Sequence, residues 1–267
     1  MRSEWSLAAA AGLALLASAA PVRAQAPAPP AAAAATPVLL PRAGFSFGWT
    51  SLIAADKRFD WQGRVAADFD IVDYGAGRVQ FLAEYEATIG RERRRYDLNQ
   101  GFYLFETTTS VRRGRVEAQA LLQHVSRHLV DREQGPAISW NVVGGRLTHR
   151  WSSADARAIE SDVEAGRFTQ PAFVDYRWMA RARVSARAAV HPRVAVIARA
   201  AGEVIGVDRR IADRTRPCGG LIEAGLRIAG RAADVEVFAG YERRVDAFAT
   251  DRVRVRWFMA GFRVVSR

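Results

Sequence analysis

Residues 79 to 89 read Val79-Gln-Phe-Leu-Ala-Glu-Tyr-Glu-Ala-Thr-Ile89, and apolar and polar side chains alternate along this stretch at almost every step. Leu82 is the one residue out of phase. Successive side chains of a β-strand point to opposite faces, so a strand that separates lipid from a polar interior has to alternate in this way. The stretch therefore predicts a membrane-spanning β-strand.

The same alternation recurs along the chain, for example in residues 116 to 123 and 178 to 188. It predicts an all-β protein, a transmembrane antiparallel up-and-down β-barrel of about 12 strands, because single-chain bacterial barrels have an even number of strands. Ten strands remain an alternative. The twelve strands are expected near 44–55, 61–73, 78–90, 99–112, 115–128, 138–151, 156–166, 176–190, 193–206, 219–230, 235–246 and 253–265.

The connections between these strands also alternate in kind. Tight turns at residues 74–77, 112–114 and 191–192 contrast with longer, charged connections at 91–98, 129–137, 167–175 and 208–217. Short turns at one end and longer loops at the other are the arrangement of outer-membrane barrels. The alternative is an exported β-sandwich, but strands of about 11 to 15 residues favour the membrane, since sandwich strands are nearer five or six.

The N-terminus predicts export. Arg2 is followed by about fourteen apolar residues, too few to span a bilayer that needs about 20, and small residues precede a cleavage position after Ala24. We expect a signal peptide at 1–24, an Ala/Pro-rich linker at 25–43 and the barrel at 44–267. The one cysteine, Cys218, allows no internal disulfide.

The formal net charge of +11 is spread over alternating positions. Export and this spreading argue against nucleic acid as a partner, and arginines in the lumen or facing lipopolysaccharide account for the charge. One strand carries inward Glu160, Asp162 and Glu164, and its neighbour carries inward Arg181, Arg183 and Arg187. Opposite charges across a hairpin predict a ladder that fills the lumen.

One segment has the composition of a catalytic site. The alternation along their strand places His124, Ser126 and His128 on its lipid-facing side, near its outer end. Residues two apart on one face lie about 6.5 to 7 Å apart, within reach for His124 to accept the hydroxyl proton of Ser126. Asn141, on the lipid face of the next strand, is the candidate that would fix the imidazole tautomer.

His-x-Ser on one strand followed by Ser139-Trp140-Asn141 on the next resembles outer-membrane phospholipase A, a twelve-stranded barrel with a lipid-facing triad. The resemblance implies Ser126 as nucleophile, His124 as base and Asn141 as orienter. It also implies calcium, dimerisation and cleavage of glycerophospholipids. The chain departs from that family at Arg127, where an Asn is usual, and in a longer His-to-Asn loop.

Residues 124 to 131, with the closing residues 251 to 254, also resemble an uncharacterised family of outer-membrane barrels with a His-x-Ser-x-His-Leu-x-Asp segment. Lipid A deacylases carry His-x-Ser on a barrel strand too. The motif thus indicates a lipid hydrolase without choosing phospholipid or lipopolysaccharide as the substrate. The alternative is a non-catalytic structural or weakly conducting barrel, whose polar residues at the rim contact lipid headgroups.

Metal sites are less well indicated. His124 and His128 would lie about 13 Å apart on a strand, too far to share a zinc ion. Asp131 and Glu133, in the outer loop, are candidate calcium ligands, and the alternative is a solvated acidic loop beside Arg127 and Arg132. The partners expected are outer-membrane lipids, lipopolysaccharide, the barrel assembly machinery and a second copy of the chain.

Overall fold

The protein is described from a computed structural model. The structure describes residues 36–133, 135–136, 138–153, 157–210, 214, 216–248, 250–252 and 254–266, without the side chains of 152 and 153. The expected signal peptide and most of the expected linker lie outside the described residues. No helix in the described part of the chain is long and apolar enough to cross a membrane.

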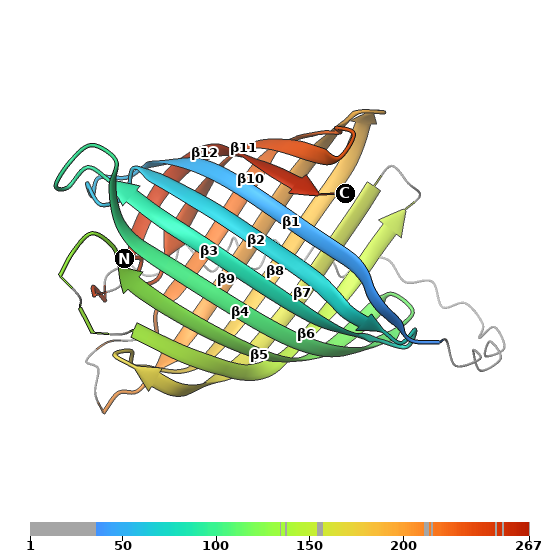
Figure 1. Cartoon of the computed structure of the whole chain (residues 1–267), viewed down its shortest axis with the longest axis horizontal. Helices are drawn as coiled ribbons and strands as arrows, with labels where there is room; N and C mark the ends of the chain where they lie inside the picture. Colours follow the sequence, from blue (N-terminus) through green and yellow to red (C-terminus); the bar gives the residue numbers. More distant parts are fainter. Residues whose placement is uncertain are drawn as a thin grey trace, which may run out of the picture. The chain divides into compact units, whose positions relative to one another are not determined.

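The described chain forms one closed antiparallel barrel of twelve strands in sequence order, sealed by pairing of the first strand with the last (Figure 1). The prediction of a twelve-stranded barrel is confirmed. The strands are β1 (Val38–Ile53), β2 (Trp61–Asp73), β3 (Arg78–Gly90), β4 (Asp97–Arg113), β5 (Val116–Leu129), β6 (Ile138–Ser153), β7 (Arg157–Ala172), β8 (Tyr176–His191), β9 (Val194–Val207), β10 (Cys218–Ile228), β11 (Ala233–Arg244) and β12 (Val255–Ser266).

Most strand bounds agree with the predictions to within about two residues, and two differ more. Strand β1 begins at Val38, inside the expected linker, and pairs with the end of β2 through a bulge. Strand β7 continues to Ala172, through most of the expected loop at 167–175. Arg167 is exposed there while Phe168 is buried, so the alternation persists, and a charge near the membrane surface does not end a strand.

The two faces of the wall differ as the alternation predicts. On β5, Val116 and Leu122 are exposed on the outside, whereas Glu117 is fully buried in the interior. Aromatic rings also lie on the outer face, as in the pair Tyr85 and Tyr103 with centroids 4.8 Å apart. Apolar side chains face lipid and charged ones face the lumen, which is the inverse of a water-soluble protein.

Arginine–carboxylate pairs join strands along the inner wall of the barrel. Arg146 contacts Glu106 at 2.7 Å and Glu164 at 2.8 Å. The predicted ladder is present where Arg183 contacts Asp162 at 2.8 Å and Glu164 at 3.0 Å. The prediction was wrong for Glu160.

Glu160 lies opposite Ser185 in the register of β7 with β8 and pairs instead with Arg150 of β6 at 2.8 Å. Arg187 lies opposite Ala158. The strand stagger, which composition does not determine, decides which charges meet.

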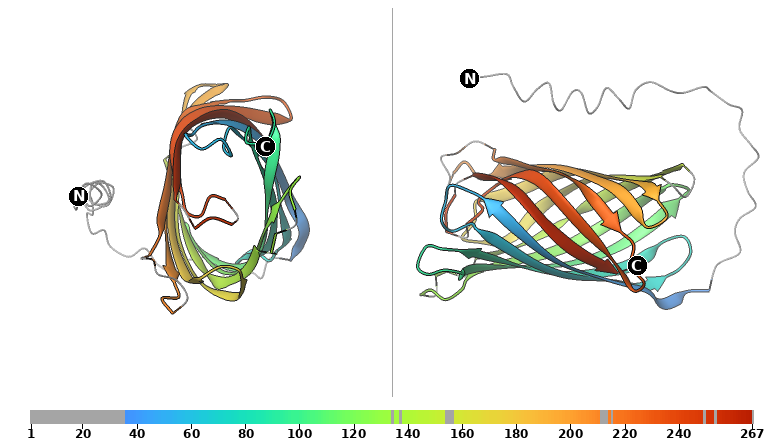
Figure 2. Two further views of the ribbon diagram at one scale, coloured as in Figure 1. Left: turned by 90° about the vertical axis from the view of Figure 1, so that its left-hand side faces the viewer. Right: turned by 90° about the horizontal axis from the view of Figure 1, so that it is seen from above.

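The connection between β11 and β12, residues 245 to 254, folds into the barrel, and we call it the inner loop. Figure 2 shows it within the ring of strands. Among its described residues, Val245, Asp246, Ala247 and Phe248 are buried. Tyr176 donates a hydrogen bond of 2.6 Å to the Asp246 carboxylate, and Gln100 donates one of 2.7 Å to the Ala247 carbonyl.

The β1–β2 loop covers the same opening. Phe59 packs edge-on against Phe248 of the inner loop, with ring centroids 6.4 Å apart. The Arg58 guanidinium lies 4.5 Å from the Phe248 ring and also pairs with Asp251. Arg58 hydrogen-bonds to Asp56 and so lowers the pKa of that carboxyl from its ordinary value. These two loops therefore occupy the interior at the end of the barrel with the longer loops, here called the loop end.

Candidate functional site

The candidate residues lie on the outer wall near the loop end. Strand β5 places His124, Ser126 and His128 on one face, with both imidazoles exposed. The register sets Asn141 of β6 opposite His124, and Ser139 opposite Ser126. Three polar side chains in a row on a lipid-facing wall depart from the apolar pattern of the residues before them on the same strand.

His124 and Asn141 are held together. Their side chains meet through His124 Nδ1 and Asn141 Oδ1, 2.8 Å apart. Because the amide oxygen is an acceptor, this contact assigns the proton to Nδ1 and leaves Nε2 as a base nitrogen. This is the tautomer that a serine–histidine mechanism requires.

Gln170 fixes Asn141 in turn. The Asn141 amide donates a hydrogen bond of 2.7 Å to the Gln170 side-chain oxygen. Gln170 lies where the register between β6 and β7 shifts, and its φ is +50°, in the left-handed region. Such bulges re-aim side chains next to functional sites. Sequence reasoning did not identify Gln170, although Pro171 directly after it is a signal for a bulge, since proline cannot donate to the strand ladder.

Ser126 is bonded to a different imidazole from the one expected. Its hydroxyl lies 2.6 Å from His128 Nε2, and the His128 ring packs edge-on against Tyr103, with centroids 5.7 Å apart. The structure thus brings His124 together with Asn141, and Ser126 together with His128. The first pair joins β5 to β6, and the second lies beside it on β5.

The loop residues considered as metal ligands are engaged with arginines. Arg94 forms an ion pair with the Asp131 carboxylate, and Arg93 donates to the Asp131 carbonyl at 3.3 Å. Glu133 is exposed. No group of three or more His, Cys, Asp or Glu in the described residues could hold a metal ion. A cation at Asp131 would therefore have to displace an arginine.

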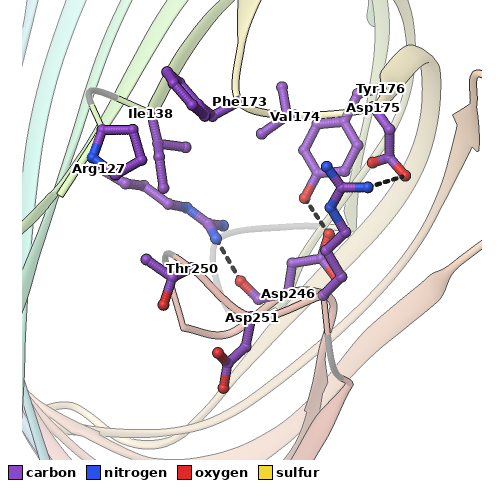
Figure 3. Close-up of a pocket in the computed structure, with 11 residues that line it drawn as sticks. Arg127, Ile138, Phe173, Val174, Asp175, Tyr176, Asp246, Thr250 and Asp251 are labelled. Carbon is purple, nitrogen blue, oxygen red and sulfur yellow. Dashed lines mark hydrogen bonds and ion pairs between the residues drawn. The ribbon is translucent and has the colours of Figure 1, made fainter. Parts of the chain in front are cut away.

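The residue between Ser126 and His128 points the other way. Arg127 enters the lumen, where its guanidinium lies 5.3 Å from the Trp140 ring and donates to the Asp246 carbonyl of the inner loop. Figure 3 shows this contact at the edge of a small polar cavity of about 180 Å³. Strand β5 is thus fastened to the inner loop directly behind the candidate site.

Comparisons with known proteins identify the fold. No protein-family model and no curated protein matches the chain. Among solved structures, the calcium-bound dimer of Salmonella typhi outer membrane phospholipase aligns with a TM-score of 0.52 and 9% identity, covering 85% of this chain and 91% of that one. Outer membrane phospholipase A from Escherichia coli aligns with a TM-score of 0.50 and 8% identity, covering 84% and 92%.

At this identity the likeness shows the fold alone. The shared fold is a closed barrel of an outer-membrane protein. It agrees with the apolar outer wall and the charged interior of this chain. The chain is a β-barrel protein of the cell outer membrane.

Proposed function

We propose that this barrel is a lipid acyl hydrolase, in which Ser126 is the nucleophile, His124 the general base and Asn141 the residue that orients the base. The hydrogen bond between His124 and Asn141, beside a serine on the lipid-facing wall, carries the proposal. Short polar motifs at a barrel rim are common, but an amide oxygen on the imidazole Nδ1 is the specific requirement of this chemistry.

The reaction would follow the serine hydrolase sequence. An imidazole takes the Ser126 proton as Oγ attacks the ester carbonyl carbon of a lipid, and then passes that proton to the departing alcohol oxygen. Water, deprotonated by the imidazole, then attacks the acyl-serine, and the imidazolium returns the proton to Ser126 Oγ as the fatty acid is released. The net change is one ester and one water converted to an acid and an alcohol.

The position of the site favours a lipid in the outer half of the bilayer. Ser126 lies toward the loop end of β5, and the arginine-rich β3–β4 loop, residues 91–95, lies at the same end. Arginine binds phosphate in a bidentate manner. The substrate is therefore a phospholipid or the acylated, phosphorylated lipid of lipopolysaccharide.

Three further features are part of the proposal. The solved phospholipase with bound calcium is a dimer, and we propose that this chain also dimerises in the outer membrane. Calcium enters as a variable of the assay, because the Asp131 carboxylate is paired with Arg94 in its absence. The barrel assembly machinery would insert the chain into the outer membrane.

Release of fatty acid from phospholipid and from lipopolysaccharide by the purified barrel in detergent, with and without calcium, tests the proposal. We expect Ser126→Ala to lower the rate by about 10⁴-fold or more, with unchanged strand content by circular dichroism. Ser51→Ala, an outward serine of β1 paired with Trp61, is the control and should keep full activity. Equal rates for Ser126→Ala and wild type would refute the proposal.

Gln170→Gly is expected to separate stability from activity. Glycine adopts the left-handed φ of residue 170 at no cost, so the unfolding free energy should rise by about 1 kcal/mol. Activity should fall several-fold, since Asn141 loses its hydrogen-bond acceptor. Urea unfolding and the acyl release assay measure the two effects, and Gln170→Ala, which loses the amide but keeps the strain, should lose activity without gaining stability.

If the wild-type protein releases no fatty acid from any of these lipids, with or without calcium, the second candidate function, a non-catalytic barrel, is favoured. The ion-paired lumen and the inner loop favour a structural barrel in that case.

A further inference from the structure

Ser126 lies between two imidazoles, and the site described above uses only one of them. His124 precedes Ser126 by two residues and His128 follows it by two, so strand geometry puts all three on one face at intervals of about 6.5 to 7 Å. The hydroxyl is bonded to His128 Nε2 at 2.6 Å. His124 is bonded to Asn141 through the opposite ring nitrogen.

Each imidazole is oriented in its own way. Asn141, itself held by Gln170, fixes the ring of His124. The edge-on contact with Tyr103 restrains the ring of His128, and Tyr103 lies directly opposite Ser126 in the register of β4 with β5. Rotation about χ1 of Ser126, between staggered wells, turns its hydroxyl toward one imidazole or the other.

We infer that His128 is an additional catalytic residue, a second general base for Ser126, so that either imidazole can accept the hydroxyl proton. This inference rests on the proposed function. In the step through His128, the Ser126 proton moves to His128 Nε2 while Oγ bonds to the ester carbon, and the imidazolium then gives the proton to the departing alcohol oxygen. His124 performs the same transfer from the other side.

Two parallel bases have a distinctive kinetic consequence. If there were one base, removing it would lower the rate as much as removing it together with the residue that orients it. With two, the remaining imidazole carries the reaction, and only the loss of both abolishes base catalysis. Asn141 orients His124 alone, so its contribution should depend on whether His128 is present.

Phenylalanine is the appropriate replacement, because it keeps an aromatic ring against Tyr103 and removes the nitrogens. We expect His124→Phe and His128→Phe each to lower fatty acid release measurably, by about three- to tenfold, and the double variant to lower it by about 10² to 10⁴-fold. Asn141→Ala should cost little alone and much more in the His128→Phe background. His191→Phe is the control, because His191 ends β8 at the end of the barrel away from the loop end.

Labelling of Ser126 by a long-chain alkyl fluorophosphonate is the second readout, since it reports activation of the nucleophile without deacylation. Slower labelling in each single variant and its loss in the double variant would support the inference. If His124→Phe is as inactive as the double variant, or if His128→Phe keeps the full rate and labelling, His128 is not a base, and the nucleophile Ser126 still stands. If Ser126→Ala is as active as wild type, the proposed function itself fails.

Discussion

Replacing Arg146 with alanine is expected to lower the free energy of unfolding by about 3 kcal/mol or more, the cost of breaking a buried ion pair by removal of one partner. Arg146 bridges Glu106 and Glu164 in the lumen, and the side chains of both glutamates are almost fully buried. Glu164 keeps Arg183 at 3.0 Å. Glu106 keeps a hydrogen bond of 2.6 Å from Gln123, which does not neutralise its charge.

The measurement is urea unfolding in lipid vesicles, followed by tryptophan fluorescence. Arg113→Ala is the matched control, since Arg113 is exposed at the end of β4 and its loss should cost within about 0.5 kcal/mol. Adding Glu106→Gln to Arg146→Ala should recover part of the loss, because it removes the unpaired charge. A loss below about 1 kcal/mol would mean that water in the lumen solvates the glutamates as well as the arginine does.

The strands could be predicted from sequence because the membrane imposes the pattern: one face must be apolar over the whole bilayer thickness. That constraint ends at the membrane surface, so the alternation does not predict where a strand ends beyond it. Residues 38 to 43 include Pro41 and do not alternate, yet they extend β1 through a bulge. Pairing with the end of β2 holds them in the sheet.

The alternation of side chains also predicted correctly that the candidate residues lie on the outer wall. The register brings Asn141 opposite His124. Parity could not decide between two imidazoles at equal spacing from Ser126, since a side-chain rotamer makes that choice. Nor could it find Gln170, which reaches Asn141 only because a bulge shifts β7 by one residue. A side-chain rotamer and a bulge are local features, and a periodic pattern of apolar and polar residues does not reveal them.

The inner loop was the least predictable element, and it leads to the second large expected effect. The predicted strands at 235–246 and 253–265 left residues 247 to 252 as a plain connection, but β11 ends at Arg244, and Val245 packs in the apolar cluster of the lumen with Tyr176. Arg214 also anchors the loop, with bonds of 2.8 Å to the Asp246 carboxylate. Contacts from β4, β5, β8 and two further loops hold it in place.

Replacing residues 246 to 252 with two glycines is expected to convert a closed barrel into one that conducts ions. A cavity of about 420 Å³ extends inward from Val245 and Tyr176 to charged residues such as Arg64 and Glu86. A barrel of twelve strands is wider than the eight-stranded barrels that side chains alone can fill. Removing the inner loop should therefore connect this cavity to the outside.

Single-channel recording in planar bilayers measures the effect: the intact protein should show no steady current, and the trimmed one discrete steps. Glycine replacement of residues 92 to 95, in the exposed β3–β4 loop, is the control and should leave the barrel closed. If the intact protein conducts as well as the trimmed one, the inner loop does not seal it. If neither conducts, the arginine–carboxylate pairs on the inner wall of β4, β6, β7 and β8 are sufficient to keep the barrel closed.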